Sequence, residues 1–357
     1  MKYLTLEKAM QQWQQIQPLS DNDKQRLSRR FTVDFNYNSN HIEGNTLTYG
    51  QTEILLLFGK VIGEANIRDV QDMTASNVTL KMMTNEAHIK NTPLTQNFIR
   101  TLHHTLLRED YTVSRVLPNG VETSYTIHAG QYKTRPNSVI TRYGDRFEYA
   151  SPEETPALMT DLIDWYNAEE KKGKLSPIEL AALFHYRYIR IHPFEDGNGR
   201  IARLIVNYIL TKHDYPMIVV RSRNKSEYLE ALHAADMIVG NIPSDGAHAS
   251  LQNIRPFLQY FKGLVAKEVY MDVCFLTEHK ENLWWYDGER IEFRSPNYAK
   301  LLMLMMSEPV LTLSDIQQHM NINMSALKKL VNQLLDKHYI ERGTNEGAWR
   351  VFITPSV

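Results

Sequence analysis

The chain has 357 residues, 43% hydrophobic and 23% charged, an ordinary composition for a globular protein long enough to form two or three domains. Lys and Arg total 40 against 41 for Asp and Glu, so the net charge of -1 excludes a strong overall basic field for nucleic acid. The single cysteine, Cys274, excludes an internal disulfide framework and fits a reducing compartment, so we expect a cytoplasmic protein. We expect no membrane partner, because no segment approaches the roughly 18 uninterrupted apolar residues of a membrane span.

The first third of the chain is predicted to be helical. Residues 4–30 carry apolar side chains at helical spacing, and the segments 50–63, 68–86 and 94–108 have few Pro or Gly interruptions. We therefore expect four helices within an N-terminal helical region that spans residues 1–110.

The next part of the chain combines a hairpin with further helices in a predicted core over residues 111–270. The segment 132–149 has two strand-like runs around a turn at Tyr143-Gly144-Asp145, which is typical of a β-hairpin. Helical patterns then recur, with Pro193 and Pro216 outside the helix interiors, where their missing amides are tolerated. These helical patterns cover residues 153–170, 177–191, 200–213, 225–238 and 250–270.

The C-terminal part of the chain changes character again. We expect a linker at 271–296 and a small domain over 297–357. This domain has three short helical patterns followed by two strand patterns around a Gly-rich turn, and it resembles a winged helix-turn-helix. The predicted helices cover residues 297–306, 313–320 and 323–337. The fold class is therefore predicted to be mainly α, a helical bundle with one hairpin and a winged helix-like tail.

The most informative stretch is 192–203, with the sequence HPFEDGNGRIAR. Gly197 and Gly199 allow unusual backbone angles and close approach, so the amides around Asn198 can face an anion. A helical pattern follows directly, and its N-terminus offers unpaired amides and the positive end of the helix dipole. The loop therefore predicts a phosphate-binding site.

The polar side chains of this loop supply the chemistry that a nucleotide site needs. His192 titrates near neutral pH and can take a proton from an attacking hydroxyl. Asp196 is a hard oxygen ligand suited to Mg²⁺ beside nucleotide phosphates. Arg200 and Arg203 share one helix face and can both reach phosphate oxygens. Each residue alone has an ordinary structural explanation, and only their combination favours the catalytic interpretation.

The loop matches the motif H-x-F-x-[DE]-G-N-G-R-x-x-R at every specified position, and on this motif the chain resembles the Fic family over roughly residues 30–270. The resemblance implies a protein adenylyltransferase, which moves AMP from ATP to a Tyr, Thr or Ser hydroxyl of a target protein and releases pyrophosphate; self-modification stays open. It also implies a role for each motif position, with Phe194 expected to pack in the core. The implied roles are general base for His192, Mg²⁺ ligand for Asp196, phosphate cradle for Gly197, Asn198 and Gly199, and binding of the β- and γ-phosphates for Arg200 and Arg203.

Two further sites rest on the same resemblance. The hairpin at 132–149 corresponds to the family's flap, which aligns a target segment by main-chain pairing, and a plain surface hairpin is the alternative. Tyr228 is the candidate aromatic side chain of the adenine pocket, with a core position as the alternative. Asp236 stands where some family members have Asn, which leaves the contacts to the base open. The flap residues expected to position a target are Lys133, Thr134, Arg135 and Val139.

A second motif lies upstream, at residues 39–45, where SNHIEGN matches the inhibitory pattern [ST]-x-x-x-E-[GN] of the same family. The resemblance implies that Ser39 and Glu43 belong to an inhibitory helix and that the Glu43 carboxylate pairs with Arg203. The carboxylate would then occupy the place of the γ-phosphate, because a buried guanidinium cannot pair with two anions at once. The alternative is a helix end followed by a glycine stop at Gly44.

The tail raises a different class of function. Six basic and five acidic side chains over 297–357 make a thin electrostatic footprint for DNA, so docking to protein is slightly favoured there. A nucleotide-sensing DNA-binding regulator is the alternative to an autoinhibited transferase. Removal of AMP from a modified protein also stays open, because Glu43 could orient a water. The expected partners are ATP with Mg²⁺ and an unidentified target protein, and the sequence leaves homo-oligomerisation open.

Overall fold

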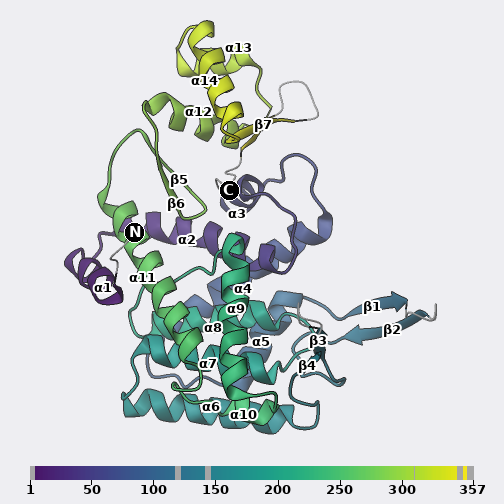
Figure 1. Cartoon of the computed structure of the whole chain (residues 1–357). Helices are drawn as coiled ribbons and strands as arrows, with labels where there is room; N and C mark the ends of the chain where they lie inside the picture. Colours follow the sequence, from purple (N-terminus) through teal and green to yellow (C-terminus); the bar gives the residue numbers. More distant parts are fainter. Residues whose placement is uncertain (1–4, 117–121, 141–145, 309, 344–348, 352–357) are drawn as a thin grey trace.

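The computed structural model describes residues 5–116, 122–140, 146–308, 310–343 and 349–351. A large helical body carries two hairpins on one side, and a smaller group of helices from the C-terminal part lies beyond it (Figure 1). The N-terminal helices are α1 (Leu6–Gln15), α2 (Asp21–Ile42), α3 (Tyr49–Phe58), α4 (Ile67–Ala87) and α5 (Gln96–Leu107). The hairpins pair β1 (Tyr111–Val116) with β2 (Glu122–Ile127) and β3 (Ser138–Ile140) with β4 (Arg146–Glu148).

The remaining elements complete the body and the C-terminal part. The body contains α6 (Thr155–Lys172), α7 (Pro177–Ile191), α8 (Asn198–Lys212), the 3₁₀ turn η1 (Ser222–Asn224), α9 (Lys225–Val239), α10 (Pro243–Ala247) and α11 (Arg255–Thr277). The C-terminal part contains β5 (Leu283–Tyr286), β6 (Glu289–Glu292), α12 (Pro296–Ser307), α13 (Leu313–Met320), α14 (Met324–Asp336), β7 (Ile340–Arg342) and β8 (Trp349–Val351). Each described sheet has two antiparallel strands. The predominance of helix confirms the mainly α part of the predicted fold class.

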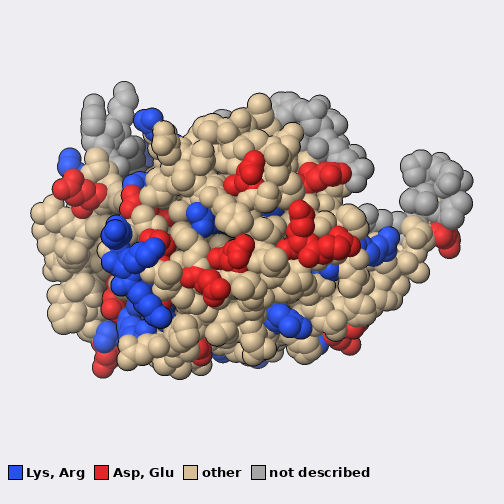
Figure 2. Space-filling model, turned by 90° about the horizontal axis from the view of Figure 1, so that it is seen from below, with Lys and Arg blue, Asp and Glu red and all other residues tan. Residues whose placement is uncertain are grey.

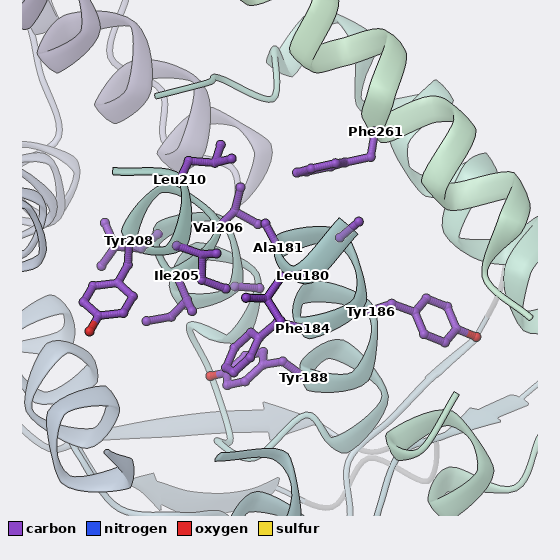
Figure 3. Close-up of a cluster of buried hydrophobic side chains, with 14 of the residues drawn as sticks. Leu180, Ala181, Phe184, Tyr186, Tyr188, Ile205, Val206, Tyr208, Leu210 and Phe261 are labelled. Carbon is purple, nitrogen blue, oxygen red and sulfur yellow. The ribbon is translucent and has the colours of Figure 1, made fainter. Parts of the chain in front are cut away.

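The helices α7 and α8 form the centre of the body, and the motif at 192–203 covers the loop between them and the first residues of α8. Both are buried nearly all round, which is typical of a central helix. Figure 3 shows Leu180 and Phe184 of α7 pointing toward Ile205 of α8, with Phe261 of α11 on one side. Burying each such side chain contributes about 1.5–3 kcal/mol, so both ends of the loop are held by rigid elements.

The N-terminal region differs from its predicted boundaries. The expected single helix over 4–30 is wrong, because Pro18 interrupts the pattern and Ser20 then caps α2 by accepting a hydrogen bond from the Asp23 amide. The helix α2 runs on to Ile42, beyond the predicted end. The motif at 39–45 therefore covers the last turn of a 22-residue helix and the residues that follow it.

The hairpins also differ from expectation. The predicted hairpin at 132–149 exists as the short pair β3–β4, and its predicted turn lies outside the described residues. The longer β1–β2 hairpin, which the sequence did not indicate, projects from the body beside it (Figure 1). The β2 side chains alternate between exposed and partly buried positions up to the buried Ile127, so only Tyr125 and Ile127 give an apolar signal in this six-residue strand.

The segment 271–296, predicted as a linker, is structured. The helix α11 extends into it, and β5–β6 forms a hairpin with a turn at Asp287-Gly288. Trp284 and Tyr286 of this hairpin share one apolar cluster with the C-terminal helices and with Tyr49 of α3. The hairpin therefore connects the body to the tail through a common core. The three helices and the terminal β7–β8 pair follow in the order predicted for the tail.

The surface carries charges of both signs. On the face in Figure 2, Lys and Arg side chains gather toward one side, and Asp and Glu side chains spread across the middle. This mixture agrees with the net charge of -1. Within the described ranges, no helix has both the length and the apolarity needed to cross a bilayer.

A buried charge network joins α2, α11 and the β5–β6 hairpin. Its centre is Arg221, whose side chain is only 3% exposed. The guanidinium contacts Asp34 of α2 at 2.8 Å, Glu268 of α11 at 2.6 Å and Asp287 of the hairpin at 3.2 Å. Asn38 of α2 also donates to Asp287 at 2.6 Å. One arginine thus ties three elements together.

We expect Arg221→Met to lower the free energy of unfolding by about 3–5 kcal/mol, because removing one member of a buried ion network leaves the others charged and unpaired. Lys24→Met is the matched control, since Lys24 pairs with Asp21 on the surface and exposed pairs contribute little. Urea unfolding of both variants checks this expectation. A midpoint for Arg221→Met equal to that of the control would contradict it.

Candidate active site

The backbone of the loop between α7 and α8 is fixed at both ends. Helix α7 begins with a capping box between Ser176 and Glu179, and His192, with a left-handed φ of 52°, is its C-cap. Gly197, with φ 76°, precedes α8, and no side-chain hydrogen bond caps that helix. The first amides of α8 have no partners within the helix, so they face outward with the positive end of the dipole. This is the predicted setting for a phosphate.

Two side chains hold the loop from behind. Asn198 accepts a hydrogen bond from the Phe194 amide at 2.9 Å and donates to the Phe194 carbonyl at 2.7 Å. Phe194 is fully buried, as predicted, and its ring stacks on His103 of α5 at 3.7 Å. The Asn198 side chain therefore fixes the loop. Only the backbone N–H of Asn198 is left to bind a ligand at the start of α8.

His192 lies half-buried at the end of α7. Its ring stacks on Tyr149 at 3.9 Å, and its buried Nδ1 has no hydrogen-bond partner among the described residues. Burial, together with the nearby positive charge of Lys133, lowers the pKa of His192 to about 3. The imidazole is therefore neutral near pH 7, the form that can accept a proton.

The four predicted flap residues occupy different environments. Lys133 is buried, and its Nζ donates to the Ile191 carbonyl at 3.1 Å and to Asn137 at 2.8 Å, which ties the flap to the end of α7. Burial lowers the pKa of Lys133 to about 7. The other three flap positions have contacts of their own. Thr134 donates to Glu195 at 3.2 Å, Arg135 lies over the ring of Tyr125 at 4.5 Å, and the backbone of Val139 pairs with Phe147.

Asp196 presents a partly exposed carboxylate beside the start of α8. Its side chain is 42% exposed, and Oδ2 lies 3.4 Å from the Arg200 guanidinium. The Arg200 Nε is buried and has no hydrogen-bond partner in the described part of the chain. Within that part, no group of three or more His, Cys, Asp or Glu residues could hold a metal ion. A single accessible carboxylate fits Mg²⁺ that takes its other oxygens from nucleotide phosphates and water.

The segment 39–45 contacts the 192–203 motif directly. The Arg203 guanidinium lies 2.7 Å from Glu43 Oε1 and donates to Ser39 Oγ at 3.1 Å and to the Ser39 carbonyl at 2.9 Å. Gly199 lies beneath this contact, because a Cβ there would meet Glu43 Oε1 at 2.5 Å. The expected pairing of Glu43 with Arg203 is thus present, directly over the predicted phosphate cradle.

Tyr228 lies in the core, which was the alternative to a place in the adenine pocket. The side chain is 3% exposed, and the hydroxyl lies 2.8 Å from His185 Nε2 inside the body. Asp236 binds the Tyr186 hydroxyl at 2.7 Å and Arg190 at 3.2 Å. In this conformation neither side chain is free to meet a base.

Several residues at the site gave no signal in the sequence. Asn137 donates to the carbonyls of His192 and Phe194 at 3.4 and 3.1 Å and so fixes the loop from the flap. His103 and Tyr111 contact Asp196. These residues come from α5 and the hairpin region, far from the loop in the sequence, so only the fold brings them together.

These features define a helical domain with a histidine-containing loop that leads into a buried helix whose N-terminus has no side-chain cap. A model of the Fic/DOC family matches residues 93–210. A crystal structure of a Fic domain containing signaling protein from Bacteroides thetaiotaomicron is 49% identical with a TM-score of 0.71, and the match covers 77% of this chain and 99% of that one. This chain belongs to the Fic/DOC family.

Similar proteins are also found among curated sequences. Protein adenylyltransferase fic-1 of Caenorhabditis briggsae is 30% identical over 237 residues, which make up 66% of this chain and 40% of that protein. A structure of Fic-1 from Caenorhabditis elegans is 25% identical with a TM-score of 0.59, covering 76% of this chain and 71% of that one. The chain spans about two-fifths of the length of the curated relatives it matches.

Proposed function

We propose that this protein is an adenylyltransferase that moves AMP from ATP to a hydroxyl side chain of a target protein, and that Glu43 holds it in an inhibited state. The observation that carries the proposal is the placement of a neutral histidine and an uncapped helix N-terminus on one rigid loop. His192 supplies the base and α8 supplies the phosphate site. The relatives named as protein adenylyltransferases support the same chemistry.

In the proposed reaction, His192 accepts the proton of the target hydroxyl. The hydroxyl oxygen forms a bond to the α-phosphorus of ATP, and the bond from that phosphorus to the bridging oxygen breaks, so pyrophosphate leaves with the electron pair. The amides at the start of α8 and the guanidinium of Arg200 hold the phosphates. Asp196 would hold Mg²⁺, which when bound would neutralise phosphate charge. Asn137 and Lys133 keep the flap fixed against the loop.

The proposed inhibition follows from competition for one guanidinium. Arg203 is 4% exposed and is already occupied by Glu43 and Ser39. A γ-phosphate that reached the same cation would bring a second negative charge against the Glu43 carboxylate. ATP would then bind with its phosphates displaced from the position needed for transfer.

The direct test uses isotopically labelled nucleoside triphosphates. We expect the full-length Glu43→Gly variant, with Mg²⁺ and a cell extract, to transfer label from ATP to protein and to gain the mass of AMP on itself or on a purified acceptor. The same incubation with labelled GTP, CTP and UTP defines the nucleotide. Asp196→Ala is the control that should lose labelling. Failure of all four nucleotides to label protein would refute the proposed function.

A further inference from the structure

Asp196 is held at both its carboxylate and its main chain. Tyr111, the first residue of β1, donates its hydroxyl to Asp196 Oδ2 at 2.5 Å. His103 Nε2 lies 2.9 Å from the main-chain carbonyl of Asp196. The Gly130 amide donates to His103 Nδ1 at 2.9 Å, so Nδ1 accepts and Nε2 carries the proton that is donated to the carbonyl. Both groups thus donate to Asp196 from outside the loop.

The Tyr111 ring is itself fixed in position. Its backbone pairs with Ile127 of β2, and the ring packs against a small apolar cluster of Leu107, Ile127 and Ala129. The Arg68 guanidinium lies over the ring at 5.0 Å. The hydroxyl therefore reaches Asp196 from a side chain with little freedom to move. This contact also joins the base of the projecting β1–β2 hairpin to the loop.

We propose that Tyr111 is a positioning residue that orients the Asp196 carboxylate for the metal ion that accompanies the nucleotide, while His103 fixes the backbone beneath it. The inference rests on the proposed function, because it takes Asp196 as the ligand. Hydrogen bonds from outer groups hold ligating carboxylates in one orientation, and their loss typically weakens metal affinity by about 10–100-fold.

A competing contact makes the role of Tyr111 specific. Oδ2 also faces Arg200 at 3.4 Å, and Oδ1 accepts from the Gly197 amide at 2.6 Å. Without the Tyr111 hydroxyl, the carboxylate can turn and close on Arg200. That pairing would remove a metal ligand and a phosphate-binding cation together, so the Tyr111 hydrogen bond keeps the two charges available for different partners.

The test measures metal-dependent nucleotide binding rather than turnover. Full-length Glu43→Gly protein and its double variants with Tyr111→Phe, Tyr125→Phe or Asp196→Ala are titrated with α,β-methylene ATP by calorimetry, in EDTA and at a series of Mn²⁺ concentrations. Tyr125→Phe is the matched control, because it removes the same hydroxyl from the partner strand of the same hairpin. Thermal unfolding of each variant confirms that it folds.

We expect Tyr111→Phe to raise, by about 10–100-fold, the Mn²⁺ concentration that gives half-maximal enhancement of nucleotide binding. Nucleotide binding in EDTA should be unchanged. Tyr125→Phe should behave like the parent. An unchanged Mn²⁺ requirement in Tyr111→Phe, with the requirement lost in Asp196→Ala, would overturn the inference and leave the metal assignment standing. Weaker binding in EDTA as well as in Mn²⁺ would reduce Tyr111 to a structural role. If Asp196→Ala keeps its Mn²⁺ dependence, the proposed metal site and the inference both fail.

Discussion

Glu43→Gly is expected to raise AMP transfer by about 10–100-fold over the wild-type protein. The variant loses one charge-assisted hydrogen bond from the Arg203 guanidinium at 2.7 Å, and such a bond contributes about 1.5–3 kcal/mol. Glycine also opens the space above Gly199. The measurement is the initial rate of label transfer from ATP to protein at saturating Mg²⁺.

Two other variants separate the contributions of charge, bulk and hydrogen bonding to this activation. Glu43→Gln removes the charge but keeps the bulk over Gly199, so its activation should be smaller. Ser39→Ala removes one hydrogen bond to Arg203 but keeps the carbonyl contact at 2.9 Å and the Glu43 pair, so its activity should stay close to wild type. Equal rates for wild type and Glu43→Gly would contradict the inhibitory assignment.

The second large effect is expected at His192. In the Glu43→Gly background, His192→Ala should lower transfer by about 10²–10⁴-fold, the usual contribution of a general base. Nucleotide binding measured by calorimetry should change little, because in the proposed binding mode the amides of α8 and Arg200, not His192, would hold the phosphates. His192→Asn is the companion variant, since asparagine tolerates the left-handed backbone at φ 52° better than alanine does. Transfer at the parental rate in both variants would rule out a base role for this residue.

The pH dependence offers an independent check on His192. Burial and the charge of Lys133 hold its pKa at about 3 in the folded state, below the ordinary value of 6.5. The unfolded chain therefore binds this proton as the pH falls through 6.5, while the folded chain does not until about pH 3. His192 should thus lower the free energy of unfolding progressively over that interval. Urea unfolding at pH 7 and pH 5 should show a smaller decrease for His192→Asn than for the parent.

The parts of the structure that the sequence predicted well have local signals. The predicted helix over 177–191 has the observed bounds of α7, where Ser176 and Glu179 form a capping box at the start and Pro193 lies beyond the end. The loop after it is a contiguous motif, so its residues fall together whatever surrounds them. Phe194 was likewise placed in the core by its position within that motif.

The end of α2 shows why other features were missed. Asn36, Asn38 and Asn40 are poor helix formers, and each donates to the carbonyl four residues before it at 2.8 Å. Contacts with other elements, such as the hydrogen bond from Asn38 to Asp287, stabilise this stretch as a helix. Lys133 was expected to position a target because the 132–149 segment resembles the family's flap. Its side chain is buried against Asn137 and the end of α7, and no local pattern in the sequence reveals these contacts.

The anchoring of α2 limits how Glu43 can leave Arg203. A helix rises only about 1.5 Å per residue, so Asp34 and Asn38, fastened by Arg221 and Asp287, lie within three turns of the carboxylate. Lys225 also holds the Ile42 carbonyl at 2.7 Å. The helix therefore resists swinging away as a rod, so Glu43 leaves Arg203 by rotation of its own partly exposed side chain or by a local backbone change next to Gly44, which has a φ of 98°.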